Sequence, residues 1–224
     1  MVLTTEWTNT IDLALKNPHW DDYDSTIQTE VSSYATRFRL NADWHIFKAQ
    51  VWTETGAAKP AWKTRPMQVG NAGDPAYATL KAGAENSSLI MSTQIKQDLA
   101  RGRHIDDGNF NIQLGMAYAY TKLSTFASVV IDQRKLTYEV KAGDSLDKIA
   151  KAVGTTVQNL VALNSGVSVI IRPKQKLIYQ KAAIQPSGCN VTAETLQNKY
   201  NGNGDSHYAE KIKYCLVVIG KLKR

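Results

Sequence analysis

Hydrophobic residues recur at intervals of three and four positions in three stretches of the chain, a spacing typical of helices with one buried face. The stretches are residues 43–55, residues 109–130 and a segment that begins after Ser206, whose hydroxyl can cap a helix. Their apolar positions are Trp44, Phe47, Val51 and Trp52; Ile112, Met116, Ala119, Leu123, Phe126 and Val130; and Ile212, Cys215, Leu216 and Ile219. The pattern predicts a mainly helical chain.

Residues 136–180 follow a different pattern. Tyr138 and Val140 alternate with polar residues as in a strand, and Gly143-Asp144 is typical of a turn. Asp144 or Ser145 can cap the helix that follows. Two short helices are expected, ending at Gly154 and Asn164, before a second strand at 176–179. The predicted order is therefore strand, helix, helix, strand.

This segment resembles the LysM family over its whole length. The matching positions are Tyr138, Val140, Gly143, Asp144, Ser145, Leu146, Ile149, Ala150, Leu160, Asn164, Ile171, Pro173, Gln175 and Leu177. Lys174 departs from the family, which usually has glycine there. The resemblance implies binding of polymers that contain N-acetylglucosamine, in a groove between two loops. The residues expected to bind the glycan are Gly143, Asp144, Ser145, Leu146, Ile171 and Arg172. Each has an alternative role in capping or in the core, and for Leu146 the core role is favoured.

Glu54 is the residue whose position points to catalysis. It ends the predicted helix at 43–55 and precedes Gly56. The negative pole of the helix dipole raises the pKa of a carboxyl there, and burial beside Trp52 and Trp62 would raise it further. A carboxyl that stays protonated near neutral pH can act as a general acid on a glycosidic oxygen. A glutamate near a helix end is nevertheless more often a solvated residue.

The context of Glu54 resembles the soluble lytic transglycosylase and goose-type lysozyme families. In these families a catalytic glutamate ends a helix, is followed by serine, and precedes a Gly-Leu-Met-Gln motif. Here Thr55 replaces the serine, and the later motif reads Arg65-Pro66-Met67-Gln68. A third signature is matched by Asn111-Ile112-x-x-Gly115-x-x-Tyr118, in which the glycine would allow close packing of helices.

The resemblance implies a role for each matching residue. Glu54 would be the catalytic acid, Gln68 would hydrogen-bond substrate or orient the acid, and Thr55 would contact substrate. Tyr200 with Asn201 would hold the glycan or the Glu54 carboxyl. Gln68 has an alternative role as a turn cap, Tyr200 as a core residue, and the Asn201-Gly202-Asn203-Gly204 run as a turn. Asp74 is a candidate second carboxylate for an inverting hydrolase, but a turn residue before Pro75 is the favoured interpretation.

The last signature of these families is Tyr-Asn followed by glycines, and then a tyrosine and a helix. It occurs only after the LysM-like segment, as Tyr200-Asn201-Gly202 with Tyr208 further on. We therefore expect a discontinuous lysozyme-like catalytic domain, residues 1–135 plus 182–224, interrupted by a LysM module at 136–181. The first 40 residues match no pattern.

Charge and cysteine usage limit the partners and compartments. The 27 basic and 20 acidic residues give a net charge of +7, and the basic excess lies beyond residue 136. This charge suits an anionic envelope, and no nucleic-acid motif or membrane span is visible. Cys189 and Cys215 are a candidate disulfide, with buried free thiols as the equal alternative. Neither they nor the scattered histidines have metal-ligand spacing, so no metal or cofactor is expected.

The expected function is cleavage of the β-1,4 bond between N-acetylmuramic acid and N-acetylglucosamine by a lytic transglycosylase, with Glu54 as acid and then base. A hydrolytic muramidase of the same fold and a non-catalytic wall-binding protein are the alternatives. The protein would act in the periplasm or cell wall. Since no Sec signal is visible, a secretion machine or phage lysis would deliver it, or the sequence has lost its signal. A secreted toxin would require an immunity or inhibitor protein as partner.

Overall fold

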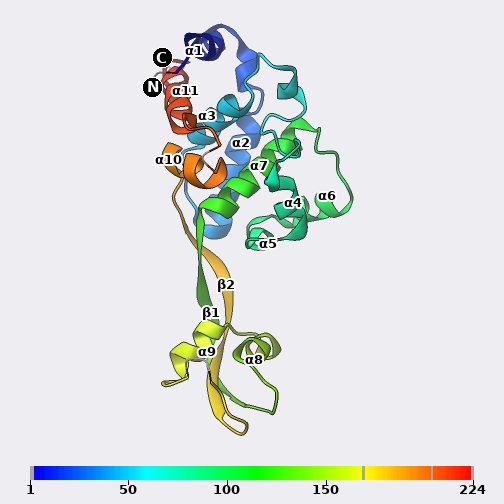
Figure 1. Ribbon diagram of the computed structural model, residues 1–224, viewed down its shortest axis with the longest axis vertical. Helices are drawn as coiled ribbons and strands as arrows, with labels where there is room; N and C mark the ends of the chain where they lie inside the picture. The colour runs from blue at the N-terminus through cyan, green and yellow to red at the C-terminus, as the bar shows by residue number, and fades with distance from the viewer. Residues whose placement is uncertain (1–2, 168–169, 203, 223–224) are drawn as a thin grey trace. The chain divides into compact units, whose positions relative to one another are not determined.

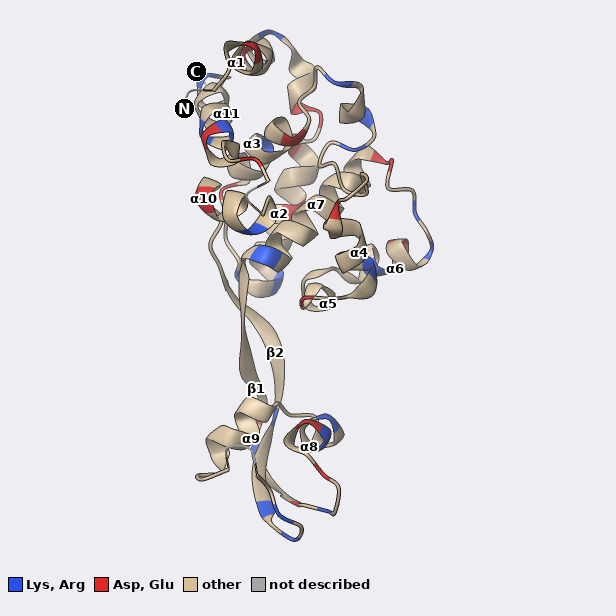
Figure 2. Cartoon of the chain, viewed as in Figure 1, with Lys and Arg blue, Asp and Glu red and all other residues tan. Residues whose placement is uncertain are grey.

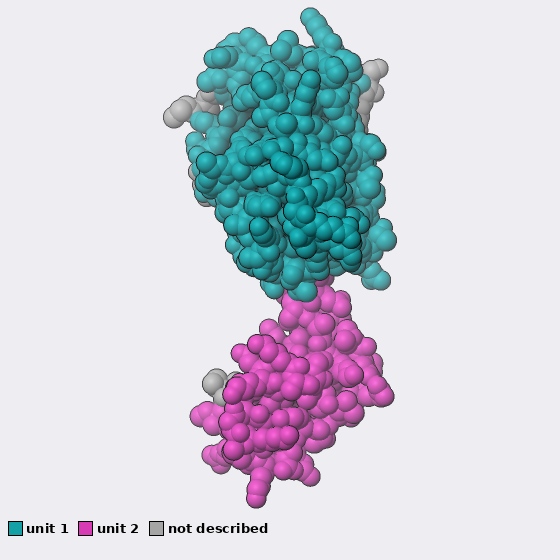
Figure 3. Space-filling model, turned by 90° about the vertical axis from the view of Figure 1, so that its right-hand side faces the viewer, with its two compact units in different colours: residues 1–125, 188–224 teal, residues 126–187 magenta. Residues whose placement is uncertain are grey.

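The computed structural model describes residues 3–167, 170–202 and 204–222. They form two compact units, residues 1–125 with 188–224 and residues 126–187 (Figure 3). The second unit extends beyond the expected module at 136–181 on both sides, because its two strands, β1 (Ser124–Glu139) and β2 (Lys176–Cys189), are longer than the sequence pattern indicated. We call the two parts the helical unit and the strand-bearing unit.

The helical unit consists of short and medium helices and contains no strand among its described residues apart from the outermost ends of β1 and β2 (Figure 1). Its elements before the interruption are α1 (Thr5–Asp12), η1 (Leu13–Lys16), η2 (Pro18–Asp21), α2 (Asp24–Phe38), α3 (Trp44–Glu54), η3 (Pro60–Lys63), α4 (Pro75–Ala82), α5 (Ser87–Ile90), α6 (Thr93–Ala100) and α7 (Gly108–Leu123). After the interruption come α10 (Ala193–Thr195), the π-helical turn η4 (Leu196–Tyr200) and α11 (Tyr208–Leu222).

Helix α3 lies at the centre of the helical unit. It begins at Asp43, whose side chain accepts a hydrogen bond from the backbone N–H of His45 at 3.0 Å. Every residue from Ile46 to Trp52 is buried, so the helix is covered on all sides. Helices α2 and α11 pack along it, and α11 comes from the part of the chain after the interruption. The core of this unit is thus built from two distant stretches of sequence.

Helix α7 is shorter than the sequence pattern predicted. It begins after Asp107, which caps the N–H of Phe110 at 3.0 Å, and it ends at Leu123. The predicted extension to residue 130 is wrong, because residues from Ser124 onward form strand β1 (Ser124–Glu139), which pairs with β2 (Lys176–Cys189). The β-branched run Val129-Val130-Ile131 favours an extended backbone, and pairing outweighs the helical spacing of the apolar residues.

The strand-bearing unit has the order β1, α8 (Leu146–Val153), α9 (Val157–Leu163), β2, as predicted. The two strands run antiparallel and form a two-stranded sheet. Ser145 rather than Asp144 caps α8, and Gly154 ends it in a left-handed conformation with φ of 69°. The core residues are Val140, Ile149, Ala150, Leu160, Val167 and Leu177.

Lys174 takes the left-handed conformation that its family's glycine would favour, with φ of 68°. The turn keeps its hydrogen bonds: Lys174 N donates to Val140 O at 2.7 Å, and Gln175 N donates to Arg172 O at 3.0 Å. Lysine in place of the family's glycine therefore leaves the turn intact, with a strained backbone at one residue.

Basic residues of this unit lie in α8 and at the turn that precedes β2 (Figure 2).

Candidate active site

Glu54 is the last residue of α3, and its partly buried carboxyl faces a hollow of about 280 Å³, which we call the Glu54 hollow. The residues that line it are Glu54, Met67, Gln68, Asn71, Ala72, Asp74, Pro75, Tyr118, Tyr200 and Asn201. They come from both stretches of the helical unit. Five residues singled out from the sequence thus share one cavity: Glu54, Gln68, Asp74, Tyr200 and Asn201.

The surroundings of Glu54 favour its protonated form. Burial raises the pKa of its carboxyl to about 7, and the negative charges of Asp74 and Asp205 act in the same direction. The Tyr208 hydroxyl, which donates a hydrogen bond to Glu54 Oε1, and the Lys211 ammonium lower that pKa. A carboxyl with these properties is poised to donate and to accept a proton near neutral pH.

The tryptophans expected to bury Glu54 have other roles. Trp52 is 1% exposed, packs edge-to-face on Trp20 with ring centroids 5.0 Å apart, and donates from Nε1 to the Trp20 carbonyl at 2.9 Å. Trp62 packs on Trp20 and Tyr23. Neither lines the Glu54 hollow, where Tyr118, Tyr200 and Met67 supply the apolar surface instead.

Gln68 contacts the backbone at the end of α3. Its side-chain Nε2 donates to the carbonyl oxygen of Glu54, one of the helix-end carbonyls that lack a partner within the helix. Gln68 has a left-handed backbone with φ of 57°, and its Oε1 accepts from Asn71 Nδ2 at 3.3 Å. Gln68 therefore lines the hollow and also holds the backbone of Glu54.

Asn111 holds the segment that carries Gln68. It is fully buried on α7, where its Oδ1 accepts from Met67 N at 3.0 Å and its Nδ2 donates to Val69 O at 3.0 Å. Gly115, one turn along, makes room for Met67: a Cβ at this glycine would lie 2.6 Å from the Met67 side chain. The glycine expected to bring two helices together instead admits the side chain of the Met-Gln segment.

Thr55, expected to contact substrate, does not line the Glu54 hollow. It is buried, and its hydroxyl donates to the carbonyl of Pro66 at 2.7 Å. In this structure the residue joins the end of α3 to the segment before Gln68. Its hydroxyl therefore helps to hold the Pro66–Gln68 segment against the end of α3.

Asp74 lies in the hollow, but both of its carboxylate oxygens are engaged by the backbone. Oδ1 accepts from Ala76 N at 3.0 Å, which caps α4, and Oδ2 accepts from Gly70 N at 2.7 Å. This matches the turn role favoured from the sequence.

Tyr200 and Asn201 complete the wall of the hollow. The Tyr200 ring packs edge-to-face on Tyr118 with centroids 5.5 Å apart, and burial raises the pKa of its hydroxyl well above the ordinary value. The Asn201 side chain accepts from Asp205 N at 2.7 Å, which shapes the segment before α11. Asn203, part of the same glycine-asparagine run, lies outside the described residues.

Tyr208 contacts the Glu54 carboxyl, although sequence reasoning assigned it no role. It begins α11, is 3% exposed, and donates to Glu54 Oε1 from a position 154 residues later in the chain. The signal was present, because Tyr208 belongs to the same final signature as Tyr200, but only the fold shows its contact with the acid.

The two cysteines are free in the structure, which corresponds to the free-thiol alternative rather than to the candidate disulfide. Cys215 is buried on α11 with its Sγ 3.7 Å from Thr53 Oγ1, and Cys189 is half-buried at the end of β2. Burial raises the pKa of the Cys215 thiol to about 12 and that of Cys189 to about 11. Both therefore remain protonated and poorly reactive.

In the strand-bearing unit, the residues expected to bind glycan divide between structural and exposed positions. Asp144 Oδ2 accepts from Tyr138 Oη at 3.0 Å and from Lys141 N at 2.8 Å, and Gly143 has φ of 83° in that turn. Ser145 caps α8. Leu146 and Ile171 are half-buried against the core, as favoured for Leu146.

Arg172 is the expected residue that lines a surface hollow of about 660 Å³. The other lining residues of this second hollow are Gly166, Ile170, Pro173, Lys174 and Gln175. Ile170, which lines this second hollow, is 79% exposed.

Across the described ranges, no three histidine, cysteine or acidic residues are placed to hold a metal ion. None of the helices described here has the length and apolar character needed to cross a membrane.

Comparisons with known proteins match part of the chain. N-acetylmuramoyl-L-alanine amidase sle1 of Staphylococcus aureus strain MRSA252 is 41% identical over 82 residues, which are 37% of this chain and 24% of that protein. The sle1 protein of strain USA300 is 39% identical over the same length. The chain thus covers about a quarter of the length of these curated relatives.

No solved structure matches the chain. The LysM family model matches residues 138–179. Residues 138–179 therefore form a LysM domain, a domain of the kind that binds peptidoglycan.

Proposed function

We propose that the helical unit cleaves the glycan strands of peptidoglycan as a lytic transglycosylase of the lysozyme-like fold, and that the LysM domain holds it at the wall. The observation that carries the proposal is the Glu54 carboxyl. It ends a buried helix, has a pKa raised to about 7, and faces a hollow lined by Gln68, Tyr200 and Asn201. These are the residue types that the final signatures of that family place around its acid.

Glu54 acts twice in the proposed reaction. Protonated, it donates its proton to the glycosidic oxygen, so that the bond from the anomeric carbon of N-acetylmuramic acid to that oxygen breaks and N-acetylglucosamine leaves. The carboxylate then accepts the proton of the 6-hydroxyl of the same muramic acid. The 6-oxygen bonds to the anomeric carbon, and a 1,6-anhydro ring closes. Tyr208, which donates to the Glu54 carboxyl, stabilises the carboxylate between the two steps.

The backbone hydrogen bonds that Asp74 accepts favour the transglycosylase reaction over hydrolysis. An inverting hydrolase needs a second carboxylate placed to activate water. Both Asp74 oxygens accept backbone hydrogen bonds, and the residue caps α4. The transglycosylase route needs no second base, because the substrate supplies its own nucleophile.

The LysM domain contributes by tethering. A domain that binds the polymer raises the local concentration of glycan for a catalytic unit on the same chain. The exposed Ile170 and the basic Arg172 and Lys174 surround its surface hollow, which suits an anionic, partly apolar wall polymer.

The test is Glu54→Gln, with purified peptidoglycan as substrate and the products separated by mass. The parent protein is expected to release fragments with anhydro-muramic ends, and the variant is expected to release none while it still sediments with the wall. Reducing ends from the parent would identify a hydrolytic muramidase instead. Equal lysis by both proteins would overturn the assignment of Glu54, and no lysis by either would identify a wall-binding protein without this activity.

A further inference from the structure

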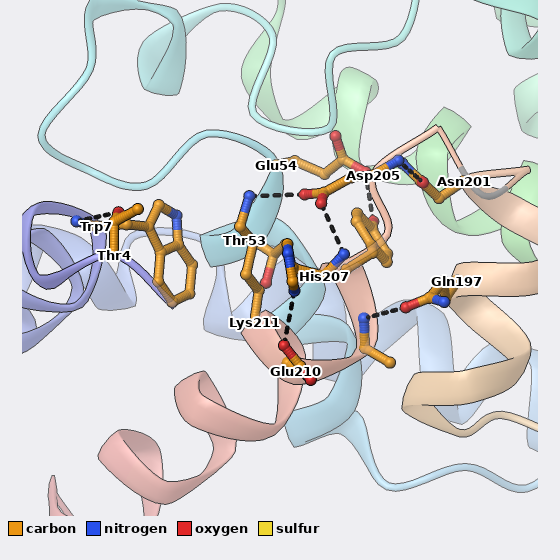
Figure 4. Close-up of polar contacts among 12 residues, drawn as sticks. Thr4, Trp7, Thr53, Glu54, Gln197, Asn201, Asp205, His207, Glu210 and Lys211 are labelled. Carbon is orange, nitrogen blue, oxygen red and sulfur yellow. Dashed lines mark hydrogen bonds and ion pairs between the residues drawn. The ribbon is translucent and has the colours of Figure 1, made fainter. Parts of the chain in front are cut away.

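The segment between η4 and α11 is held in place by hydrogen bonds that converge on Asp205 (Figure 4). The backbone N–H of Asp205 donates to Asn201 Oδ1 at 2.7 Å, and its carboxylate Oδ1 accepts from His207 N at 2.9 Å. The other carboxylate oxygen, Oδ2, accepts from Lys211 Nζ at 2.6 Å. The backbone N–H and both side-chain oxygens of Asp205 are thus engaged.

Lys211 and Tyr208 share one side of α11. They are three residues apart, so their side chains lie one turn along the same face. Tyr208 contacts the Glu54 carboxyl, and Lys211 contacts Asp205 beside it. The Lys211 ammonium also lies 5.6 Å from the ring centre of Trp7 on α1, which covers it from the other side. Helix α1 belongs to the N-terminal stretch that matched no pattern in the sequence.

The charged groups that face Glu54 come from three elements. Asp74 precedes α4, Asp205 precedes α11, and Lys211 lies on α11; Tyr208 and Tyr200 face it as neutral hydroxyls. Asp205 and Lys211 act on the Glu54 pKa in opposite directions. Burial would raise the pKa of Asp205, but the hydrogen bonds from Lys211 and His207 keep it below its ordinary value, so Asp205 is ionised at neutral pH.

We propose that Asp205 and Lys211 are positioning residues for Glu54. Their ion pair fixes the segment that brings Tyr208 to the acid, and their opposite charges offset one another beside the Glu54 carboxyl. The pair is only partly exposed, with 31% of the Asp205 side chain and 25% of the Lys211 side chain accessible, so water screens it incompletely. The inference rests on the proposed role of Glu54 as the acid.

The experiment compares Asp205→Asn, Lys211→Met and the double variant. The rate of an enzyme that uses a general acid falls as the pH rises past the pKa of that acid, and we call this part of the pH–rate profile the alkaline limb. Lys211→Met removes the charge that favours ionised Glu54, so the alkaline limb is expected to move up by roughly one pH unit. Asp205→Asn removes the charge that opposes ionisation, so the limb is expected to move down by a similar amount. The double variant is expected to lie near the parent.

Two further variants separate charge from structure. Lys213→Met removes a lysine from the same helix that pairs with Glu194 and is 60% exposed, and it is expected to leave the limb unchanged. Lys211→Arg keeps the charge and is expected to retain the parental limb. A merely structural role for the pair would lower the rate in every variant at Asp205 or Lys211 without opposite shifts.

A second readout does not depend on activity. The carboxyl carbon of Glu54 in protein labelled with carbon-13, assigned by its loss in Glu54→Gln, reports the ionisation of this group directly. Opposite shifts of its midpoint in the two single variants would support the inference. Shifts in the same direction, or none, would overturn it. If Glu54→Gln retains lysis, the proposed function fails, while the carbon titration still tests the pair.

Discussion

The LysM domain and the helical unit organise their important residues in different ways. In the LysM domain, Ser145 caps α8 by accepting from the N–H of Lys148 three residues later, and Gly154 ends that helix. Asp144 accepts from Lys141 N in the turn before it, so these contacts are local in sequence. In the helical unit, Glu54 meets Tyr208 from 154 positions away, and Met67 meets Asn111 from 44. The order of elements built on local contacts can be predicted from sequence alone, whereas contacts between distant residues are visible there only as separate motifs.

The largest expected effect is at Asn111, because it supports the site without lining it. Asn111→Ala leaves the Met67 N–H and the Val69 carbonyl without their partners in a fully buried position. We expect a loss of about 2–4 kcal/mol in the free energy of unfolding of the helical unit. Chemical denaturation followed by tryptophan fluorescence measures it, since all five tryptophans lie before residue 63. A variant as stable as the parent would show that Asn111 does not hold the Met67–Val69 segment.

Glu54→Gln is expected to make the helical unit more stable at alkaline pH. The folded-state pKa of Glu54, about 7, lies above its unfolded value, so the folded protein binds the proton more tightly. Stability is therefore highest below the unfolded pKa and declines as pH rises toward the folded pKa. The variant lacks this decline, and we expect it to gain about 1–3 kcal/mol over the parent at pH 8 and little at pH 4. Thermal unfolding at both values measures the gain, and an equal effect at the two pH values would contradict the raised pKa.

Asn164→Ala tests the local organisation of the LysM domain. The Asn164 side chain donates to Leu160 O and Ile178 O, both at 2.7 Å, and accepts from Ile178 N at 2.8 Å, so it joins the end of α9 to β2. Since the residue is partly exposed, we expect a loss of about 1–2 kcal/mol. Binding to insoluble peptidoglycan should weaken, while cleavage of short soluble glycans stays at the parental rate. Asn198→Ala, at an exposed position in η4, is the matched control for the loss of an asparagine.

The smallest effect is expected at Lys174, where the backbone is left-handed with φ of 68°. Lys174→Gly relieves this strain but adds conformational freedom to the unfolded chain, so we expect a net gain of about 0.5–1 kcal/mol. The melting temperature of the LysM domain, followed by hydrogen exchange of Val140 and Gln175, measures it. A loss of stability would mean that the lysine side chain makes a contribution larger than the strain.

The same contrast explains how far the sequence predicted the structure. The order of the LysM elements followed from caps, turns and alternation within 45 residues, and the structure has them in that order. The end of α7 at Leu123 was missed because residues 124–130 carry a helical spacing, and only their pairing with β2 makes them extended. In the helical unit, Glu54 and Gln68 were found as motifs, but the roles of Thr55 and Tyr208 depend on contacts that no local pattern encodes.

The way the chain passes through the LysM domain affects its response to proteases. The chain enters this domain through β1 and leaves it through β2, so one cut in a loop such as the one between α8 and α9 produces two fragments rather than a detached domain. The fragments stay associated, because α11 of the second packs along α3 of the first and the two strands remain paired. A LysM domain joined by a single linker is released by one cleavage. Here the part that binds the wall and the part that carries Glu54 remain together after one cut, and two cuts are needed to separate them.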